Sequence, residues 1–272
     1  MPEIAEVETV RNVLKARILN KKIVDIKVLY PNMILNDIYN FRNSIINNEF
    51  KDIKRKGKWL IFEINNYYLL SHLRMEGKFF TKSKNDPIEK HEHIIFYFED
   101  DTTLRYHDTR KFGKMKLIKH DELETTEEIA KQGIEPIDDS LTSEYLLDKF
   151  KGKTIAIKTS LLDQTIISGL GNIYVDEVLF AANINPLRKT NTITQSECDR
   201  IISSANRIIK KAIKEGGCTI KSYTSSLGVI GNYQNYLKVH QRKDELCLVC
   251  RTPIVKTVVN GRGTYYCPVC QK

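Results

Sequence analysis

Cys247-Leu248-Val249-Cys250 and Cys267-Pro268-Val269-Cys270 are two cysteine pairs that determine the fold at the end of this 272-residue chain. Their spacing, C-x2-C-x16-C-x2-C, allows two tight knuckles to close over one tetrahedral Zn²⁺ ion bound by four thiolates. Because the protein would supply all four ligands, the zinc is expected to be structural. The same stretch contains no acid and four cations, so we expect a basic, zinc-stabilised hairpin that contacts nucleic acid: Arg251, Lys256, Arg262 and Lys272.

The charge of the whole chain points in the same direction. The sequence has 43 Lys and Arg against 34 Asp and Glu, a formal charge of +9. Such a balance favours a polyanionic partner, although many basic proteins bind none. No apolar run approaches the roughly 18 residues of a membrane span, and no signal peptide is recognisable. Six cysteines, four of them with metal-site spacing, fit a reducing compartment, so a cytoplasmic protein without a membrane partner is expected.

The first half of the chain is predicted to be one helix followed by strands. Val7, Val10, Leu14 and Ile18 recur at helical spacing. Short runs rich in β-branched and aromatic residues come next. They predict a β-sandwich or flattened barrel built on an N-terminal helix, with strands at Ile23–Tyr30, Trp59–Ile64, Tyr67–Arg74, His93–Glu99, Thr103–His107 and Lys114–Ile118.

Beyond a polar stretch at Gly133–Ser140 the pattern becomes helical. Helices are expected at Ser143–Phe150, Ile173–Ala182 and Thr194–Glu215. The last begins with a T-x-x-E capping box and ends at two glycines. Its predicted buried face consists of Ile201, Ile202, Ala205, Ile208, Ile209 and Ile213. The fold class is therefore α+β, with strands in a first domain, helices and the zinc hairpin in a second, and a cleft between them.

The start of the chain, Met1-Pro2-Glu3, could carry chemistry. Removal of the initiator methionine would expose Pro2 as a secondary amine, and an α-amino group titrates near 8, so a substantial fraction is neutral at physiological pH. Such an amine can form a Schiff base, with Glu3 beside it as acid or base. A proline before a helix is also common without any chemistry. These residues alone favour the proline without chemistry.

A second candidate is the glycine turn Ser168-Gly169-Leu170-Gly171-Asn172, which leads directly into a predicted helix. Backbone N–H groups exposed there, with Asn172 and Lys158 nearby, would hold a phosphate. A glycine turn between helices is weak evidence by itself.

Six short motifs, taken in order, resemble the formamidopyrimidine-DNA glycosylase family. They run from residue 2 to residue 271, and the glycine turn is similar to that family's helix–two-turn–helix. The motifs are Pro2-Glu3…Glu6, Lys56-Gly57-Lys58-Trp59-Leu60, His72-Leu73-Arg74-Met75-Glu76-Gly77, Asp108-Thr109-Arg110-Lys111-Phe112-Gly113, Leu170-Gly171-Asn172-Ile173-Tyr174 and Gly261-Arg262-Gly263-Thr264. The resemblance implies a catalytic β-sandwich domain at 1–133, a linker at 134–141, a helix–two-turn–helix domain at 142–232 and a zinc finger at 233–272.

The resemblance also implies a role for each matched residue. Pro2 would attack C1′ of a damaged nucleotide with Glu3 as acid/base partner, while Lys58 would serve β-elimination. Arg262 would serve δ-elimination. Because its guanidinium stays protonated, we expect it to clamp a phosphate rather than to donate a proton. The remaining implied roles are DNA binding by His91, Arg110, Lys153, Lys158 and Asn172, an intercalating wedge of Met75, Arg110 and Phe112, and lesion-facing Glu6 and Glu76.

The implied enzyme is a bacterial bifunctional glycosylase and AP lyase that removes oxidised purines such as 8-oxoguanine and formamidopyrimidines. It would need one structural Zn²⁺, act on damaged double-stranded DNA as a monomer, and use Gly217–Gly228 as a lid over the extruded base. The chain departs from the family pattern at Ile4-Ala5 and at Gln241, neither of which is assigned to chemistry.

Two other functions compete with this interpretation. An endonuclease VIII-like relative would favour oxidised pyrimidines, but it usually lacks the wedge pattern of Met75-Glu76 with Arg110 and Phe112. A non-catalytic zinc-ribbon protein that binds damaged or bent DNA would explain the charge and the zinc. It would not explain Pro2, Glu3 and Lys58 in family order.

Overall fold

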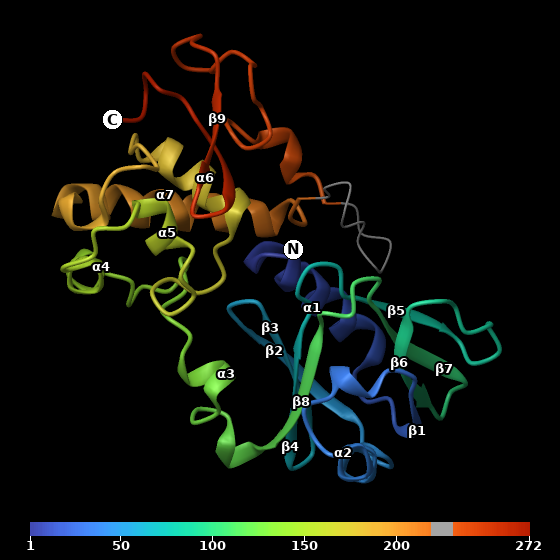
Figure 1. The fold of residues 1–272 in the computed structure, drawn as a ribbon. Helices are drawn as coiled ribbons and strands as arrows, with labels where there is room; N and C mark the ends of the chain where they lie inside the picture. Colours follow the sequence, from blue (N-terminus) through green and yellow to red (C-terminus); the bar gives the residue numbers. More distant parts are fainter. Residues whose placement is uncertain (219–230) are drawn as a thin grey trace. The chain divides into compact units, whose positions relative to one another are not determined.

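The computed structural model describes residues 1–218 and 231–272, which belong to two compact units (Figure 1). Unit 1 consists of residues 1–130 and 216–232, and unit 2 of residues 131–215 and 233–272. Most of the predicted lid, from residue 219 onward, lies outside the described residues.

Unit 1 is built from one long helix and two four-stranded antiparallel sheets. Helix α1 (Ile4–Ile18) is followed by β1 (Ile23–Val28), α2 (Ile38–Ile45), β2 (Phe50–Lys56), β3 (Trp59–Ile64), β4 (Tyr67–His72), β5 (Lys78–Ser83), β6 (Glu92–Phe98), β7 (Thr102–His107), β8 (Lys114–Lys119) and α3 (Glu127–Ala130). The strand orders are β1-β6-β7-β5 and β2-β3-β4-β8. One apolar core joins α1 to both sheets, so the predicted helix and β-sandwich are confirmed.

Two strands of unit 1, β2 and β5, are absent from the prediction. In β2 the register shifts between Phe50 and Asp52, so that both Phe50 and Ile53 are fully buried although they are three residues apart. This bulge breaks the two-residue alternation by which a strand is usually recognised. The strand ends at Lys56, and Gly57 and Lys58 form the short turn that leads into β3.

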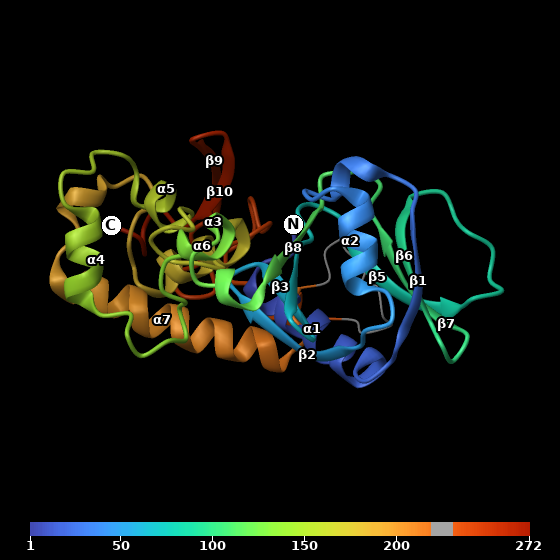
Figure 2. The same ribbon diagram turned by 90° about the horizontal axis from the view of Figure 1, so that it is seen from below.

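Unit 2 contains α4 (Ser143–Phe150), α5 (Ile157–Leu161), α6 (Asn172–Ala181), α7 (Gln195–Lys214) and a hairpin of β9 (Val255–Val259) and β10 (Arg262–Tyr266). Helix α7 contacts α4 and α6, beside which it runs in Figure 2, and α6 contacts β10. The capping box is present: the Glu197 carboxylate accepts from the Thr194 N–H at 2.9 Å.

The predicted buried face of α7 needs one adjustment. Ile202 and Ile213 are only half-buried, whereas Ser204 and Ala212 are buried. The buried stripe is therefore shifted around the helix relative to the predicted one.

Candidate functional site

The start of α1 is a buried polar site in unit 1. Pro2 is buried, and Glu3 and Glu6 are only 2% and 5% exposed. One oxygen of the Glu6 carboxylate accepts the Glu3 N–H at 2.8 Å, and the other accepts the Cys218 N–H at 2.7 Å. Glu6 therefore joins the beginning of the chain to a segment more than 200 residues later.

The amine of Met1 shows which charges surround the N-terminus. Burial lowers the pKa of this amine, and the charge of Lys58 lowers it further, whereas Glu3, Glu6 and Glu76 act to raise it. Burial is the largest of these effects. Three distant segments of unit 1 therefore bring their charges to the Met1 amine, and desolvation favours its neutral form.

Lys58 lies in the tight turn between β2 and β3 and is only 5% exposed. Gly57 before it has φ +55°, a backbone conformation that favours glycine. Next to this turn His72 packs edge-on against Trp59, and its Nδ1 accepts the Arg74 N–H at 2.9 Å. Burial, together with the charges of Arg74 and Lys58, lowers the pKa of His72 to about 3, so its imidazole is neutral near pH 7.

Two loops of unit 1, Leu73–Gly77 and Asp108–Gly113, are fixed against the same side chain, Tyr106. A Cβ atom on Gly77 would lie 2.1 Å from the Tyr106 hydroxyl oxygen, and one on Gly113 would lie 1.7 Å from it. The Thr109 hydroxyl also donates a hydrogen bond to Glu76 across the two loops. The loops are thus held side by side, and neither glycine can be replaced without displacing Tyr106 or the loop.

The second of these loops folds around the buried carboxylate of Asp108. It accepts the Arg110 N–H at 3.0 Å and the Gly113 N–H at 2.8 Å. Between these two anchors the guanidinium carbon of Arg110 lies 4.8 Å from the centre of the Phe112 ring, and Phe112 is 49% exposed. An exposed aromatic ring on a firmly anchored loop is suited to insertion between bases.

His91 lies at the end of the β5–β6 connection, next to the Asp108 loop. Its carbonyl accepts the Asp108 N–H at 3.0 Å, and its ring packs edge-on against His107. The connection is shaped by Arg105, which is 1% exposed and donates to the carbonyls of Ser83, Asp86 and Pro87 and to the Glu92 carboxylate.

In unit 2 the β9–β10 hairpin presents Arg262 at its tip. Asn260 and Gly261 both have positive φ, +46° and +71°, as required of the two central residues of a type I′ turn. Arg262 follows them and is exposed. One residue further, the Gly263 carbonyl accepts from Asn172 Nδ2 at 2.9 Å and from Lys158 Nζ at 3.0 Å.

A buried ionic network contacts strand β10 of this hairpin. Asp176 on α6 accepts from Lys158 Nζ at 2.7 Å through one oxygen; through the other it pairs with His240 Nδ1 at 2.7 Å and accepts the Tyr265 N–H at 3.3 Å. The neighbouring Glu177 carboxylate accepts three consecutive backbone N–H groups, from residues 238 to 240. Burial raises the pKa of Glu177.

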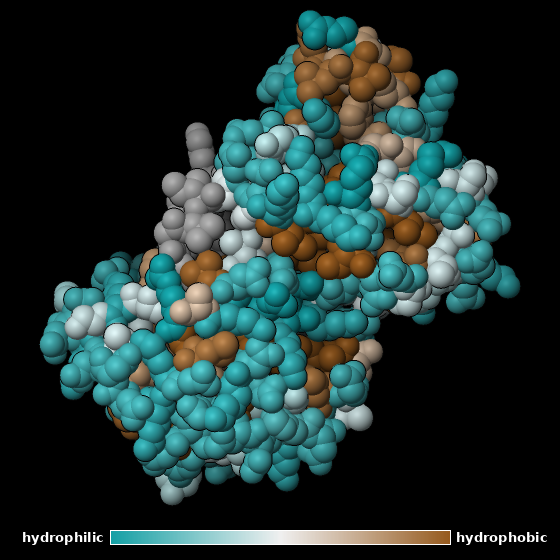
Figure 3. All heavy atoms as spheres, turned by 180° about the vertical axis from the view of Figure 1, so that it is seen from behind, coloured by the Kyte–Doolittle hydropathy of each residue, from teal (hydrophilic) through white to brown (hydrophobic). Residues whose placement is uncertain are grey.

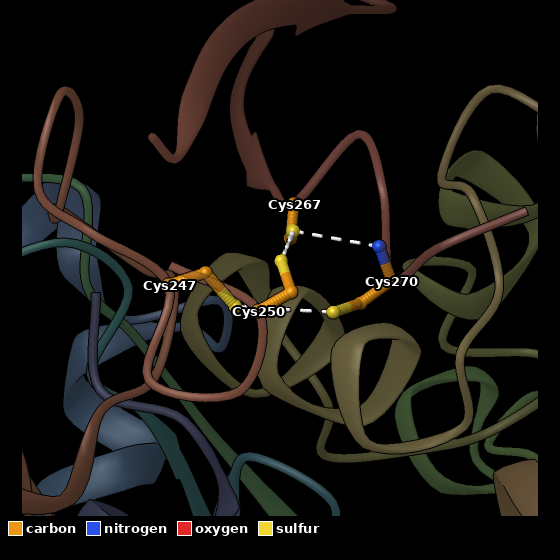
Figure 4. A group of neighbouring side chains, drawn as sticks. All are labelled: Cys247, Cys250, Cys267 and Cys270. Atoms are coloured by element: carbon orange, nitrogen blue, oxygen red, sulfur yellow. Dashed lines mark hydrogen bonds between the residues drawn. The ribbon is translucent and has the colours of Figure 1, made fainter. Parts of the chain in front are cut away.

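The four cysteines of unit 2 converge as their spacing predicts (Figure 4). Their Sγ atoms all lie within 4.8 Å of one another, with Cys250 and Cys267 3.4 Å apart and Cys247 and Cys270 3.9 Å apart. Four thiolates at about 2.3 Å from a tetrahedral Zn²⁺ ion would be separated by about 3.8 Å, so the donors fit this metal. The Val249 and Cys270 N–H groups donate to sulfur, as outer-shell groups of such sites do.

Comparison with known proteins identifies the family. Residues 1–115 match the formamidopyrimidine-DNA glycosylase N-terminal domain, residues 132–224 match the H2TH domain of the same enzyme, and residues 238–272 match a zinc finger found in FPG and IleRS. The chain belongs to the formamidopyrimidine-DNA glycosylase family.

Individual relatives are similar over the whole chain. The formamidopyrimidine-DNA glycosylase of Bacillus cereus is 44% identical, and the match covers 100% of this chain and 99% of the relative. A Lactococcus lactis FPG mutant, in complex with a DNA containing Fapy-dG, superposes with a TM-score of 0.95 at 42% identity and covers 100% of both chains. The wild-type L. lactis protein, in complex with an oxidised-pyrimidine DNA, gives 0.93 at 42% identity, again over 100% of both chains.

The family assignment confirms the predicted fold class and the structural zinc. Among residues 1–218 and 231–272, no helix combines the length and apolar character that crossing a membrane requires.

The roles expected of the individual residues stay predictions, and the structure places them as follows. Unit 1 gathers the N-terminal amine, Glu3, Glu6, Lys58 and Glu76 at one site. Met75 is half-buried in a loop beside the one that carries Arg110 and Phe112. In unit 2, Arg262 and Asn172 meet at the hairpin. Lys153 is half-buried in the segment between α4 and α5.

Lys158 has a different position from the one that the glycine turn suggested. Its ammonium was expected beside a bound phosphate, but the side chain is fully buried and paired with Asp176. The sequence reasoning also missed Asp176, Glu177 and His240. A usable signal existed, because two adjacent carboxylates in the otherwise apolar helix α6 must be buried with partners.

Proposed function

We propose that this chain is a bifunctional glycosylase and AP lyase that excises oxidised purines with the amine of Pro2 as nucleophile. Membership of the family makes the chain a DNA glycosylase of base excision repair whose partner is damaged double-stranded DNA. The observation that carries the catalytic proposal is the N-terminus itself. Pro2 is buried, and the Met1 amine one residue before it lies within reach of the charges of Glu3, Lys58 and Glu76, in surroundings that lower its pKa chiefly by desolvation.

In the proposed first step, the Pro2 nitrogen exposed by removal of Met1 attacks C1′ of the damaged nucleotide. The bond between C1′ and the base breaks, and its electron pair leaves with the base, which takes up a proton. Opening of the sugar ring transfers a proton to its ring oxygen and leaves an iminium ion between Pro2 and C1′. Glu3, buried beside the amine, is suited to hold these protons, because an acid–base group must lie within hydrogen-bond reach of the atoms it serves.

The iminium ion then acidifies the neighbouring carbon and permits strand cleavage. Loss of a proton from C2′ expels the 3′ phosphate, and loss of a proton from C4′ expels the 5′ phosphate. We assign the first elimination to Lys58, whose ammonium is near the N-terminus. We assign Arg262 to the second as a phosphate clamp, since a guanidinium stays charged and binds phosphate in a bidentate manner.

The remaining site residues would bind and deform the DNA. We assign His91, Arg110, Lys153, Lys158 and Asn172 to DNA binding, with Lys158 acting through the Gly263 carbonyl rather than on a phosphate. Met75, Arg110 and Phe112 would fill the space left by the extruded nucleotide. Glu6 and Glu76 would face the lesion.

We further propose the predicted division of labour: a catalytic domain at 1–133, a linker at 134–141, a helix–two-turn–helix domain at 142–232 and a zinc finger at 233–272. The enzyme would act as a monomer in the bacterial cytoplasm, on the nucleoid.

Borohydride trapping tests the catalytic proposal. With a duplex containing 8-oxoguanine, borohydride should reduce the iminium ion to a stable protein–DNA adduct. The adduct should disappear in Pro2→Gly, and also when Met1 is retained, while both proteins still bind a duplex with a non-cleavable abasic analogue. Trapping that persists when Met1 is retained would refute Pro2 as the nucleophile.

The same experiment separates the competing functions. Oxidised-pyrimidine duplexes run in parallel test the endonuclease VIII-like alternative, which the DNA in the second L. lactis complex makes worth measuring. Faster single-turnover excision of the pyrimidine lesion would overturn the purine preference. The absence of an adduct with any lesion would favour a non-catalytic binder.

A further inference from the structure

Unit 2 contains a cavity of about 370 Å³ between α6, α7, the Tyr233–Tyr236 turn and the first zinc knuckle. None of the residues to which we assign catalysis or DNA binding lines it. Its walls are apolar and aromatic: Phe180, Ile208 and Tyr233 are less than 10% exposed, whereas Leu248 and Val249 are 50% and 73% exposed. A concave apolar site of this size is typical of ligand binding.

The zinc module also carries apolar side chains on its outside. Leu248 and Val249 lie between the two cysteines of the first knuckle, and further aliphatic side chains of the module are more than 40% exposed: Leu246, Val258 and Val269. Figure 3 shows apolar surface gathered on the zinc module, at the top of the view. Leu248 and Val249 bring exposed apolar surface to the cavity itself, which is characteristic of a site that binds another molecule.

The rim of the cavity is cationic. Arg207, Lys211 and Lys238 line it, and among the residues that the structure describes none of the three forms an ion pair through its side chain. Lys211 Nζ lies 3.6 Å from the centre of the Tyr236 ring, and this cation–π contact holds the ammonium at the cavity. Three cations without acidic partners around one opening favour an anionic ligand over a neutral or cationic one.

The single acid of the lining does not alter this balance. The Glu177 carboxylate is 3% exposed and accepts the N–H groups of Lys238, Val239 and His240. It therefore acts as an internal acceptor that fixes the segment entering the zinc finger. The ligand would meet a cationic rim and an apolar interior.

We propose that this cavity is a docking site for an acidic peptide segment of a partner protein that carries an apolar anchor residue. The carboxylates would pair with Arg207, Lys211 and Lys238, and the anchor would enter between Phe180, Tyr233 and Val249. DNA suits the cavity less well, because phosphates are bound by cations and backbone N–H groups and gain nothing from a concave aliphatic wall. The proposal is independent of the proposed catalytic mechanism.

Fluorescence anisotropy with the full, zinc-loaded chain tests the proposal. The probe is a fluorescein-labelled peptide, Asp-Glu-Asp-Leu-Phe-Glu-Asp, with two control peptides: one replaces Leu and Phe by Ser, and the other replaces every acid by its amide. Neither control peptide should bind. Binding of the probe should weaken about tenfold in the double variant Arg207→Glu/Lys211→Glu and several-fold in Val249→Ser.

The matched control is Lys210→Glu, which reverses a charge on an exposed position of the same helix that does not line the cavity. It should leave peptide binding within about twofold of wild type. All variants should retain wild-type cleavage of a lesion duplex, which verifies that they fold.

Three outcomes would overturn the proposal. The first is that the probe shows no saturable binding at millimolar protein. The second is that Lys210→Glu weakens probe binding as much as the double variant does. The third is that undamaged duplex displaces the probe and that its own binding depends equally on Arg207 and Lys211. The last would make the cavity part of the DNA-binding surface.

Discussion

Replacing Gly113 by alanine should both destabilise unit 1 and loosen the loop that carries Arg110 and Phe112. The added Cβ would lie 1.7 Å from the Tyr106 hydroxyl oxygen and 2.7 Å from its Cζ. Ordinary contacts of this kind exceed 3.4 Å, so the ring or the loop must move by well over 1 Å. Tyr106 is fully buried and packs edge-on against Phe79, so the ring cannot yield.

Overpacking a well-filled core costs about 1–3 kcal/mol. The very short contact and the immobile ring place Gly113→Ala at the upper end, about 3 kcal/mol of unfolding free energy. Any part of this strain that is relieved by moving the loop would break the 2.8 Å hydrogen bond from the Gly113 N–H to Asp108. Affinity for a duplex with an abasic analogue should then fall about tenfold or more, because the wedge is no longer held in place.

Urea unfolding followed by tryptophan fluorescence measures the loss of unfolding free energy in unit 1, because Trp59 is the only tryptophan of the chain and lies in that unit. The control variant is Gly263→Ala, whose Cβ would meet its nearest atom, on Lys256, at an ordinary 3.6 Å. It should leave the Trp59 transition unchanged. Removing the offending oxygen with Tyr106→Phe should recover about half of the loss in the double variant, because the 2.7 Å contact with Cζ remains.

The explanation would be refuted if Gly113→Ala unfolded at the wild-type urea concentration and bound DNA normally. It would also be refuted if Tyr106→Phe had no effect on the cost of the alanine.

Three further predictions concern zinc and pH. Chelating the zinc should abolish DNA binding, measured by anisotropy, and leave the Trp59 unfolding transition of unit 1 intact. The pKa of His72 is about 3 in the folded chain against 6.5 unfolded, so the unfolded chain alone takes up a proton as the pH falls. Between pH 6.5 and 5 the unfolding free energy should drop by about 1.6 kcal/mol, and His72→Gln should flatten this slope in urea titrations. The hydrogen bond from Arg188 lowers the pKa of Glu197 to about 2, so the stabilisation from the ionised Glu197 is present above about pH 4.5 and is lost as the pH falls through 2. Glu197→Gln should therefore lower the unfolding free energy by about 2 kcal/mol at pH 7 and by almost nothing at pH 2, as measured by unfolding followed by circular dichroism at 222 nm.

Local chemistry explains which elements could be predicted from the sequence. The capping box of Thr194 and Glu197 and the knuckle spacing of the cysteines are set by residues within a few positions of one another, and both appear in the structure as predicted. The Asn260-Gly261 pair was an equally local signal for the hairpin turn. Short-range patterns of this kind can be read directly because they depend little on the rest of the fold.

Burial of charge could not be predicted in the same way. Lys158 reads as an exposed phosphate ligand, and only its pairing with Asp176, 18 residues away on another helix, places it in the interior. Arg105 falls within a predicted strand that gave no sign of a buried charge, yet it donates to carbonyls along the β5–β6 connection. Such positions depend on tertiary contacts for which a single sequence carries no periodic signal.

The N-terminal site shows how opposing charges and burial combine. Three carboxylates act to raise the pKa of the amine, which would keep it protonated and unreactive, and yet its pKa is lowered because burial is the larger effect. The charge of Lys58 adds to the lowering. Both oxygens of Glu6 accept backbone N–H groups, which hold its charge in a fixed position at this site. Exposing this site to water would therefore remove the largest of the effects that lower the pKa of the Met1 amine, even if every charged residue stayed in place.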